Sequence, residues 1–397
     1  MYRLAYFLLL ISIPVFSQVE KDFVSYNKIT FELYEKQDWN KLIICGKEAL
    51  KNEYDFFYMR VRLGIAYYEK GNFSRAIYHL EKALLFNDTD PAVLEYLYFA
   101  YIFSDRYQEA CRLYYKNYQI FREKTLSVRP KVLDNLNIQG GIKFSNQNKE
   151  LGTQVNDISY GLIGTTINIK GRFTLFQYAG ILNHGFTDKF INEGFLYHYQ
   201  YYINQFEYYI SGNLLLGKGW SMNPAYHLIR VEAFNQKYND HYYGLSVNKN
   251  FNKVRLGINI SKAYILDTDV VQIVPEISYY PLGNTKLYFT LKNTNNKSGE
   301  NDPYNQISGK MGFKIFNKTW LEGLYAYGKI QFLAHDNGYV LYNNPDYLIS
   351  RGGLILYQYF NNYTQLILSF QLENKEQITT RDPYTHHFVM AGLNIKF

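Results

Sequence analysis

The sequence predicts an α + β chain in two parts: an all-α unit of about three helical repeats, then an antiparallel transmembrane β-barrel of about 14 strands. Three observations carry this prediction. Residue types recur with a step of 34 between residues 23 and 122, the apolar period falls from 3.6 to 2 near residue 133, and the chain ends on the aromatic residue Phe397. We expect a signal peptide at 1–17, the helical unit at 18–125, a linker at 126–132, and the barrel, with 12 to 16 strands, at 133–397.

The first residues are typical of a secretory signal. In "MYRLAYFLLLISIPVFSQ" a single charge, Arg3, precedes an apolar run from Leu4 to Phe16. Small Ser17 follows, so we expect cleavage between Ser17 and Gln18. The run has about 13 residues, fewer than the roughly 20 of a relaxed membrane helix, although an uncleaved anchor remains the alternative.

The helical unit is predicted by four columns of residues that stay in phase over a step of 34. Each column holds mostly apolar residues at the same place in successive segments. The columns are Trp39, Phe73 and Tyr107; Leu33, Tyr67 and Tyr101; Leu42, Ala76 and Ala110; and Ile29, Leu63 and Leu97. A fixed period of this length indicates stacked supersecondary units, each of which buries its apolar face against the next.

Residues 23–122 resemble three tetratricopeptide (TPR) repeats, each a helix, a tight turn and a second antiparallel helix. The middle copy matches best, at Leu63, Gly64, Tyr67, Ala76, Leu80 and Ala83. Its small residues let two helices approach closely, and its large ones fill the gaps between repeats. The outer copies depart from the pattern, with Thr30 and Tyr98 in place of Gly and Asn117 in place of Ala, as expected of end repeats.

The TPR resemblance implies a concave surface lined by the first helix of each pair. The matching positions here are Phe31, Tyr34, Ile65, Tyr68, Phe99 and Ile102. An aromatic groove of this kind would hold a peptide or a helix of a periplasmic protein partner. The alternative is that these side chains pack between helices or against the next domain. TPR repeats bind and scaffold rather than catalyse.

Beyond Pro130 the apolar residues alternate with polar ones. In "KVRLGINIS", "TKLYFTLK" and "GKMGFKIF" every second residue is apolar, which predicts strands with one apolar and one polar face. Two architectures fit such strands. One is a soluble sandwich or barrel with an apolar interior, and the other is a membrane barrel with an apolar exterior.

Strand length and connections favour the membrane barrel. The alternating segments run about 10 to 14 residues, which is the length that a tilted membrane strand requires. Short connections are expected at "IKGRF", "INQFE", "NFNKV", "PLGNT", "FNKTW" and "FNNYT", and longer polar ones at 147–156, 186–193, 296–304, 332–347 and 374–384. Tyrosines in "YHYQYYINQFEYYI" are expected to meet the lipid interfaces. The strand count is ambiguous between residues 205 and 250.

The secretion signal, the alternating segments and the terminal Phe together resemble Gram-negative outer-membrane β-barrel proteins, whose tight turns face the periplasm and whose longer loops face outward. The resemblance covers residues 133–397 as a pattern of architecture. The whole layout, a periplasmic TPR unit before a barrel, resembles the outer-membrane export subunits of the exopolysaccharides cellulose and poly-N-acetylglucosamine. It implies an outer-membrane location among outer-membrane lipids, with the TPR region in the periplasm, and an even number of strands.

The end of the chain is predicted to be the last barrel strand. Its apolar residues are expected to face lipid, and they are Val389, Ala391, Leu393, Ile395 and Phe397. The terminal Phe resembles the signal by which barrel-assembly machinery recognises its clients during biogenesis. We expect this strand to pair with the first one, near residues 133–147, because a closed barrel leaves no free edge.

Cations on the polar faces of the strands are the one indication of a substrate. They are Lys170, Arg255, Lys286, Lys292, Lys310, Lys314 and Lys396. A basic lumen would favour an anionic solute or an acidic glycan. The alternative is that these cations pair with the inward carboxylates of Glu276, Glu322 and Glu373 or extend to the rim. The sequence shows no insertion that resembles a plug.

Other function classes find little support in the sequence. Outer-membrane phospholipases and lipid deacylases resemble one another in a Ser two residues after a His, and the barrel histidines lack that spacing: His184, His198, His227, His241, His335, His386 and His387. We therefore expect no enzyme, no catalytic residues, no metal and no cofactor. Cys45 and Cys111 are expected in helix cores. A net charge of +7 without a basic run indicates no nucleic-acid partner.

Two functions remain. In the first, the barrel conducts or exports a polymer or an anionic solute, and the TPR unit recruits envelope partners to its mouth. In the second, a plugged barrel anchors a TPR scaffold for protein–protein interactions at the membrane.

Overall fold

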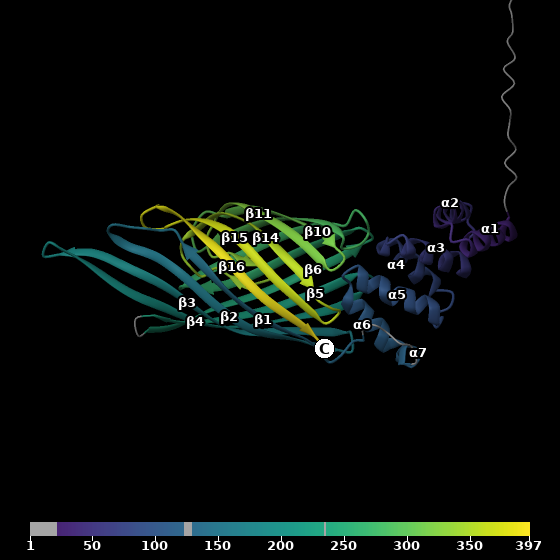
Figure 1. The fold of residues 1–397 in the computed structure, drawn as a ribbon, viewed down its shortest axis with the longest axis horizontal. Coiled ribbons are helices and arrows are strands. Elements are labelled where there is room, and N and C mark those ends of the chain that lie inside the picture. Colours follow the sequence, from purple (N-terminus) through teal and green to yellow (C-terminus); the bar gives the residue numbers. More distant parts are fainter. Residues whose placement is uncertain (1–21, 123–128, 234–235) are drawn as a thin grey trace, which may run out of the picture.

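The computed structural model describes residues 22–122, 129–233 and 236–397, so the expected signal peptide at 1–17 lies outside the described residues. Within these ranges seven helices precede a closed barrel of 14 antiparallel strands, which confirms the predicted fold class and strand number (Figure 1). The helices lie at one end of the barrel, where the chain also terminates. None of these helices is long and apolar enough to cross a lipid bilayer.

The helices form antiparallel pairs followed by a short last helix. They are α1 (Phe23–Glu35), α2 (Trp39–Lys51), α3 (Phe57–Glu69), α4 (Phe73–Ala83), α5 (Pro91–Phe103), α6 (Tyr107–Lys116) and α7 (Tyr118–Arg122). Polar side chains cap several N-termini: Asp38 accepts a hydrogen bond from the backbone N–H of Lys41, and Asn72 does the same for Arg75. Caps of this kind satisfy backbone donors that the first turn of a helix leaves unpaired.

The turn inside each helix pair repeats the 34-residue step of the sequence. Gln37, Gly71 and Asp105 occupy these turns, and each has a positive φ, of 54°, 69° and 60°. A left-handed residue lets the chain reverse directly into the next helix. One continuous core of buried apolar residues joins all the pairs, from Tyr26 to Phe121. Cys45 and Cys111 are buried in helices, as predicted.

The barrel strands follow one another around the wall, and the last pairs with the first. They are β1 (Leu133–Ser145), β2 (Gly152–Ile169), β3 (Phe173–Asn192), β4 (Phe195–Gly217), β5 (Trp220–Ala233), β6 (Gln236–Phe251), β7 (Val254–Ile265), β8 (Thr268–Tyr279), β9 (Leu287–Ser298), β10 (Tyr304–Phe316), β11 (Thr319–Ile330), β14 (Tyr347–Tyr359), β15 (Thr364–Glu376) and β16 (Pro383–Lys396). The β1–β16 ladder closes the barrel from Asn135↔Lys396 to Ser145↔His386.

The apolar side of the strands faces outward, which decides between the two predicted architectures. On β7, Leu256, Ile258 and Ile260 are each more than 40% exposed, and Asn259 between them points into the lumen. A band of exposed aliphatic and aromatic side chains surrounds the barrel in the same way. Exposure of this kind is typical of a lipid-facing wall and costs free energy in water.

The final strand lies as its sequence indicates. Val389, Ala391 and Leu393 are exposed on the outer surface of β16, with Ile395 half-buried beside them. Phe397 follows the strand, and its backbone N–H donates to the carbonyl of Asp134 on β1 (3.0 Å). The end of the chain is thereby fixed to the first strand.

Three predicted connections are wrong. "INQFE" (203–207) is no turn, because Asn204 and Gln205 continue β4, and the real turn at 218–219 uses the left-handed Lys218 and Gly219. Residues 186–193 form no long loop, because β3 and β4 run through them to a tight turn at Glu193 and Gly194. The stretch 332–347 does not extend outward, because it folds into the barrel.

We call residues 331–346 the inner loop. It contains the two short strands β12 (Ala334–His335) and β13 (Val340–Leu341), which pair with each other and not with the barrel wall. Phe332, Ala334 and Leu341 belong to a buried apolar cluster with aliphatic and aromatic side chains of the lumen wall, which include Tyr178, Tyr209 and Tyr242. Apolar side chains within a polar stretch explain the inward fold, since these residues would lose their burial outside the barrel.

Candidate functional site

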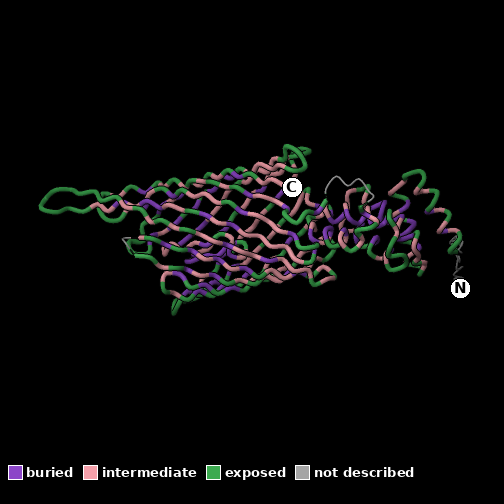
Figure 2. Tube along the Cα trace, turned by 90° about the horizontal axis from the view of Figure 1, so that it is seen from below, coloured by how far each residue is buried: buried purple, intermediate pink, exposed green. Residues whose placement is uncertain are grey.

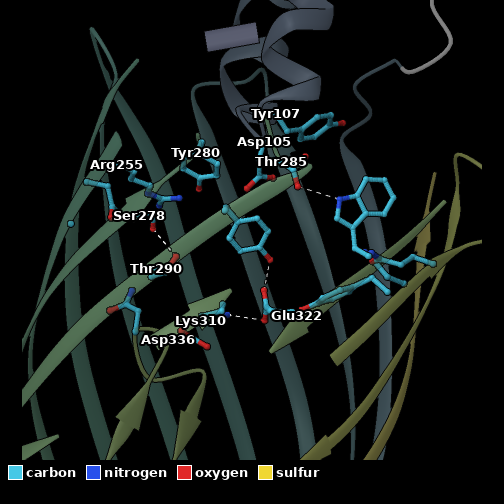
Figure 3. Close-up of a pocket in the computed structure, with 18 of the residues that line it drawn as sticks. Asp105, Tyr107, Arg255, Ser278, Tyr280, Thr285, Thr290, Lys310, Glu322 and Asp336 are labelled. Carbon is cyan, nitrogen blue, oxygen red and sulfur yellow. Dashed lines mark hydrogen bonds and ion pairs between the residues drawn. The ribbon is translucent and has the colours of Figure 1, made fainter. Parts of the chain in front are cut away.

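The lumen contains a cavity of about 1330 Å3 between the helical unit and the inner loop. Figure 3 shows its arrangement: Asp105 and Tyr107 reach down from the helices, and Asp336 of the inner loop lies at the opposite end. Strands β4 to β11 supply most of the wall, and β14 to β16 and β1 supply the remainder. A pocket of this size is large enough to hold several small-molecule units at once.

The helical unit closes much of the barrel mouth. Phe73, Ile102 and Phe103 form an apolar roof over the cavity. Beside them, the α5–α6 turn places the Asp105 carboxyl opposite Arg255 of β7. Burial raises the pKa of Asp105, while the positive charge of Arg255 acts in the opposite direction. The roof therefore combines an apolar cover with one carboxyl that faces a cation.

Specific polar contacts hold the helical unit on the barrel. Asn284 in the β8–β9 turn donates to the carbonyl of Gly71 (2.7 Å), and Gln108 of α6 donates to the carbonyl of Asn213 on β4 (2.6 Å). Tyr107 donates to the Asp134 carboxylate (2.5 Å), and the Lys396 ammonium lies over the Tyr107 ring at 3.7 Å. These contacts come from different turns and strands, so they fix both the position and the rotation of the unit.

The β2–β3 turn packs closely on α6, which further fixes the helical unit on the barrel. Gly171, in the β2–β3 turn, lies so near the backbone of Cys111 and Arg112 that a Cβ atom there would overlap with both residues. Its φ of 67° also favours glycine. Lys170 belongs to this same turn, so the prediction that it points into the lumen is wrong.

Two of the predicted lumen cations are in ion pairs on the cavity wall. Lys292 Nζ lies 3.0 Å from a Glu276 carboxylate oxygen, and Lys310 Nζ lies 3.1 Å from Glu322. Tyr288 also donates a hydrogen bond to Glu322. For these two lysines, the contacts agree with the alternative prediction that lumen cations and inward carboxylates neutralise one another.

The other predicted cations line the cavity without such pairs. Within the described residues Arg255, Lys286 and Lys314 have no carboxylate oxygen within 4 Å. The Lys314 ammonium lies 4.6 Å from the centre of the Trp320 ring, near the mouth. The complete lining holds seven Lys and Arg side chains against five Asp and Glu, so the cavity is net positive.

The inner loop is anchored to the wall mainly through polar groups. Gln272 of β8 donates to the carbonyl of Ala334 (2.8 Å) and accepts from its N–H (3.2 Å). Asn337 donates to the carbonyl of Asn223 on β5 (2.9 Å). The Asp336 carboxylate lies 2.9 Å from Lys292 Nζ, and this ammonium lowers the pKa of Asp336 far below its usual range.

A buried charge cluster lies where the inner loop rejoins the wall. Glu373 of β15 accepts from Lys143 (2.9 Å) and from the Tyr342 hydroxyl (2.6 Å), and Lys375 lies 3.4 Å away. Arg351 donates to the same Tyr342 hydroxyl (3.1 Å). Three cations thus surround one carboxylate, and Tyr342 connects this network to the inner loop.

The predicted groove positions of the helical unit have different surroundings. Ile65 is 5% exposed and belongs to the core, and Tyr34, Tyr68 and Phe99 are half-buried against neighbouring helices. Ile102 lines the barrel cavity. Phe31 is 47% exposed at the far end of the unit. Partner binding by this groove stays a prediction.

Sequence reasoning missed the inner loop and its anchors. Asn223, Gln272 and Gln139 contact the loop, yet each is one polar residue among many on alternating strands. The apolar residues inside the polar stretch 331–346 were the available signal. Among the described residues, no group of three His, Cys, Asp or Glu side chains is arranged to hold a metal.

No family model and no curated protein sequence matches this chain. Solved structures with a similar fold include a bacterial polysaccharide outer membrane secretin, at 11% identity over 68% of this chain and 100% of that one (TM-score 0.41). The deltaS2S3 mutant of the TodX monoaromatic hydrocarbon channel is 8% identical over 67% of this chain and 91% of that one (TM-score 0.44). The translocator domain of the autotransporter NalP from Neisseria meningitidis is 9% identical over 75% and 100% (TM-score 0.36).

The architecture of the chain is better evidence for the type of fold than these matches at low identity. The strands close on themselves, the outer wall is apolar, and the lumen is polar and charged. The fold is that of an outer-membrane β-barrel protein. A closed barrel of this kind satisfies every strand edge within lipid, which supports an outer-membrane location.

Proposed function

We propose that this barrel conducts or exports an anionic solute or polymer across the outer membrane, with the inner loop as the movable barrier. The observation that carries the proposal is the large, net-positive cavity, which the inner loop lines on the side opposite the helices. Besides its apolar contacts, the loop is fixed to the wall by hydrogen bonds and one ion pair, which water can replace when the loop moves. A barrel of 14 strands is wide enough to leave space inside once the loop is displaced.

Charge selectivity of the current tests the nature of the solute. Under a potassium chloride gradient across a planar bilayer, we expect a reversal potential that favours chloride, because Lys286 and Lys314 near the mouth are not neutralised by carboxylates. Changing both to Glu is expected to reverse the preference. Lys297→Glu, on the outer surface of β9, is the matched control and should leave the reversal potential unchanged. Cation preference in the unmodified protein would contradict an anionic solute.

We further propose that the helical unit acts in the periplasm and recruits an envelope protein to the barrel mouth. Its α3–α6 edge is occupied by the barrel, whereas the first helix pair lies farthest from the barrel (Figure 1). Where α1 meets α3, the Arg62 guanidinium of α3 lies 5.3 Å from the ring centre of Phe31 on α1 and 5.6 Å from that of Tyr58 on α3. Both rings are about half exposed, as is common for aromatic anchors of interfaces.

Affinity purification from outer membranes tests the recruitment. The double variant Phe31→Ala/Tyr58→Ala is expected to lose a partner that co-purifies with the unmodified chain, since aromatic anchors carry much of the binding energy of an interface. Ile44→Ala/Leu85→Ala removes exposed apolar side chains elsewhere on the unit and should retain the partner. Equal recovery from all three proteins would contradict this surface.

A plugged anchor is the second candidate function. It is favoured by the buried contacts of Phe332, Ala334 and Leu341 with the lumen wall, because a loop that never moves would also pack in this way. In that case the barrel only holds the helical scaffold at the membrane. The two functions differ in whether the intact protein ever carries current.

A further inference from the structure

The β3–β4 hairpin extends well beyond the rest of the barrel wall. Its two strands pair without a register shift from Phe173↔Leu214 to Asn192↔Phe195. On one side the neighbouring strand β5 joins β4 only from Asn204 onward, and on the other side β2 accompanies β3 as far as Lys189. Figures 1 and 2 show the hairpin projecting at the end opposite the helical unit, with exposed residues over most of its length. Among the described residues, the β4 edge of the hairpin has no neighbouring strand from Phe195 to Ile203, and the β3 edge has none from Phe190 onward.

One face of the extension continues the lumen wall. Tyr178 on β3 and Tyr209 on β4 are 3% exposed and pack against the inner loop, so they mark the inward side of the two strands. Ile181 and Phe206, at odd and even positions of these strands, are exposed on the lipid side. Because side chains alternate with a period of two and the pairing is regular, every inward position of the extension can be assigned.

The inward positions of the extension are mostly aromatic. We call the five whose rings stack on one another the aromatic ladder, namely Phe186, Phe190, Tyr197, Tyr199 and Tyr201, and Phe195 lies on the same face at the hairpin tip. The expectation that the tyrosines of this stretch meet the lipid interface is therefore wrong for Tyr197, Tyr199 and Tyr201. They lie on the lumen side instead.

The rings of the ladder stack nearly parallel. Phe186 and Tyr201 have ring centres 5.4 Å apart at an angle of 11°, and Phe190 and Tyr197 are 5.7 Å apart at 15°. Tyr199 stacks on Tyr201 at 5.9 Å and 28°. Phe190, Tyr197 and Tyr199 remain about half exposed. The result is a strip of aromatic surface that leads from the lumen exit along the hairpin.

We propose that the aromatic ladder binds a linear polysaccharide as it leaves the lumen. Sugar rings present C–H groups on their flat faces, and these groups are attracted to the negative face of an aromatic ring. The Tyr197 and Tyr199 hydroxyls, with the exposed Asn192 on the same face, offer hydrogen bonds to the sugar hydroxyls at the ring edges. The inference rests on the proposed passage function and names the class of polymer.

The position of the ladder selects this occupant over others. The opposite face, which carries the exposed side chains of Ile191, Leu196 and Tyr202, points away from the barrel axis. A solute that leaves the lumen along the barrel axis passes along the ladder. Repeated stacking sites also suit a repeating chain, because each ring binds any unit of the chain equally well and lets it slide.

Binding of defined glycans to the full chain in detergent micelles tests the proposal. The probes are cellohexaose, as a neutral linear glucan, and a hexameric mannuronate, as an acidic one, with affinity measured by calorimetry. The ladder variant Phe190→Ala/Tyr197→Ala/Tyr199→Ala is expected to weaken binding of at least one probe by about tenfold or more, since three stacking partners are lost. The control Ile191→Ala/Leu196→Ala/Tyr202→Ala removes three side chains from the other face of the same hairpin and should bind as the unmodified protein does.

Two results would overturn the inference: absence of glycan binding by the unmodified protein, or equal weakening in the two variants. Heat-dependent gel mobility verifies that each variant is a folded barrel. The ladder lies outside the inner loop, so its binding does not require an open lumen. If the barrel conducts but its ladder binds neither glycan, the passage function is retained and only the assignment of a polysaccharide as the solute is rejected.

Discussion

Shortening the inner loop is expected to convert the barrel into a steadily conducting channel. In this variant a Gly-Ser-Gly linker replaces residues 334–341. The change removes Ala334, Leu341 and the ion pair of Asp336 from the lumen, and with them the buried contacts that fill its centre. The wall itself keeps all 14 strands, because β12 and β13 pair only with each other.

Single-channel recording in planar bilayers measures the effect. We expect a conductance several-fold above that of the intact protein, with few closures, because water can occupy the lumen from end to end. Shortening the β9–β10 loop at 299–303 is the control, since this loop lies outside the lumen and its removal should leave the conductance unchanged. An unchanged conductance in the 334–341 variant would show that the helical unit, rather than the inner loop, closes the path.

Gly171→Ala is expected to release the helical unit from the barrel. The new methyl group would overlap the backbone of Cys111 and Arg112, which cannot shift without moving α6. The contacts of Tyr107 and Gln108 with the barrel lie on the same helix and would be lost together. Hydrogen–deuterium exchange in α6 is expected to increase strongly, while exchange in the barrel strands stays the same.

Gly194→Ala is the matched control for this change. Gly194 also has a positive φ, of 83°, but a Cβ atom there would meet no other atom within 4 Å. Both variants therefore carry the cost of a left-handed alanine, about 1 to 2 kcal/mol, and only Gly171→Ala adds the overlap with α6. Similar exchange in the two variants would contradict a rigidly docked helical unit.

The fold was predictable because two simple periods dominate the sequence. The step of 34 reflects helix pairs whose turns need a left-handed residue at the same place, as at Gln37, Gly71 and Asp105. The period of two reflects strands with lipid on one side and water on the other, as at Leu256 and Ile258. Both patterns repeat many times, so a local irregularity does not obscure them.

The connections were harder to predict, because polarity alone does not distinguish a turn from a strand in a water-filled barrel. Asn204 and Gln205 resemble turn residues, yet they lie within β4. There the Asn204 side chain accepts a hydrogen bond from Asn183 on the neighbouring strand β3 (2.6 Å). Glu193 and Gly194 form the true turn within a stretch of polar and aromatic residues that resembled a loop. Strand pairing over a long distance determines these positions.

The cations of the candidate site could be predicted from the sequence, but the inner loop that folds into the lumen could not. Of the seven cations placed on the polar faces of the strands, six line the cavity, and only Lys170 does not. Nothing in the sequence indicated that Lys292 meets Asp336 of a loop 44 positions away, because that contact depends on the inward fold of residues 331–346. Contacts of this kind arise from tertiary packing, which a periodic pattern does not encode.

Current through the intact protein tests the central claim most directly, namely that the inner loop is a movable barrier. We expect brief openings at raised voltage, and we expect a reducible bifunctional thiol crosslinker between Gln272→Cys and Ala334→Cys, which lie on wall and loop, to abolish them until a reductant is added. If the intact protein carries no current at any voltage while the variant shortened at 334–341 conducts, the passage function is contradicted. The barrel would then be a plugged anchor.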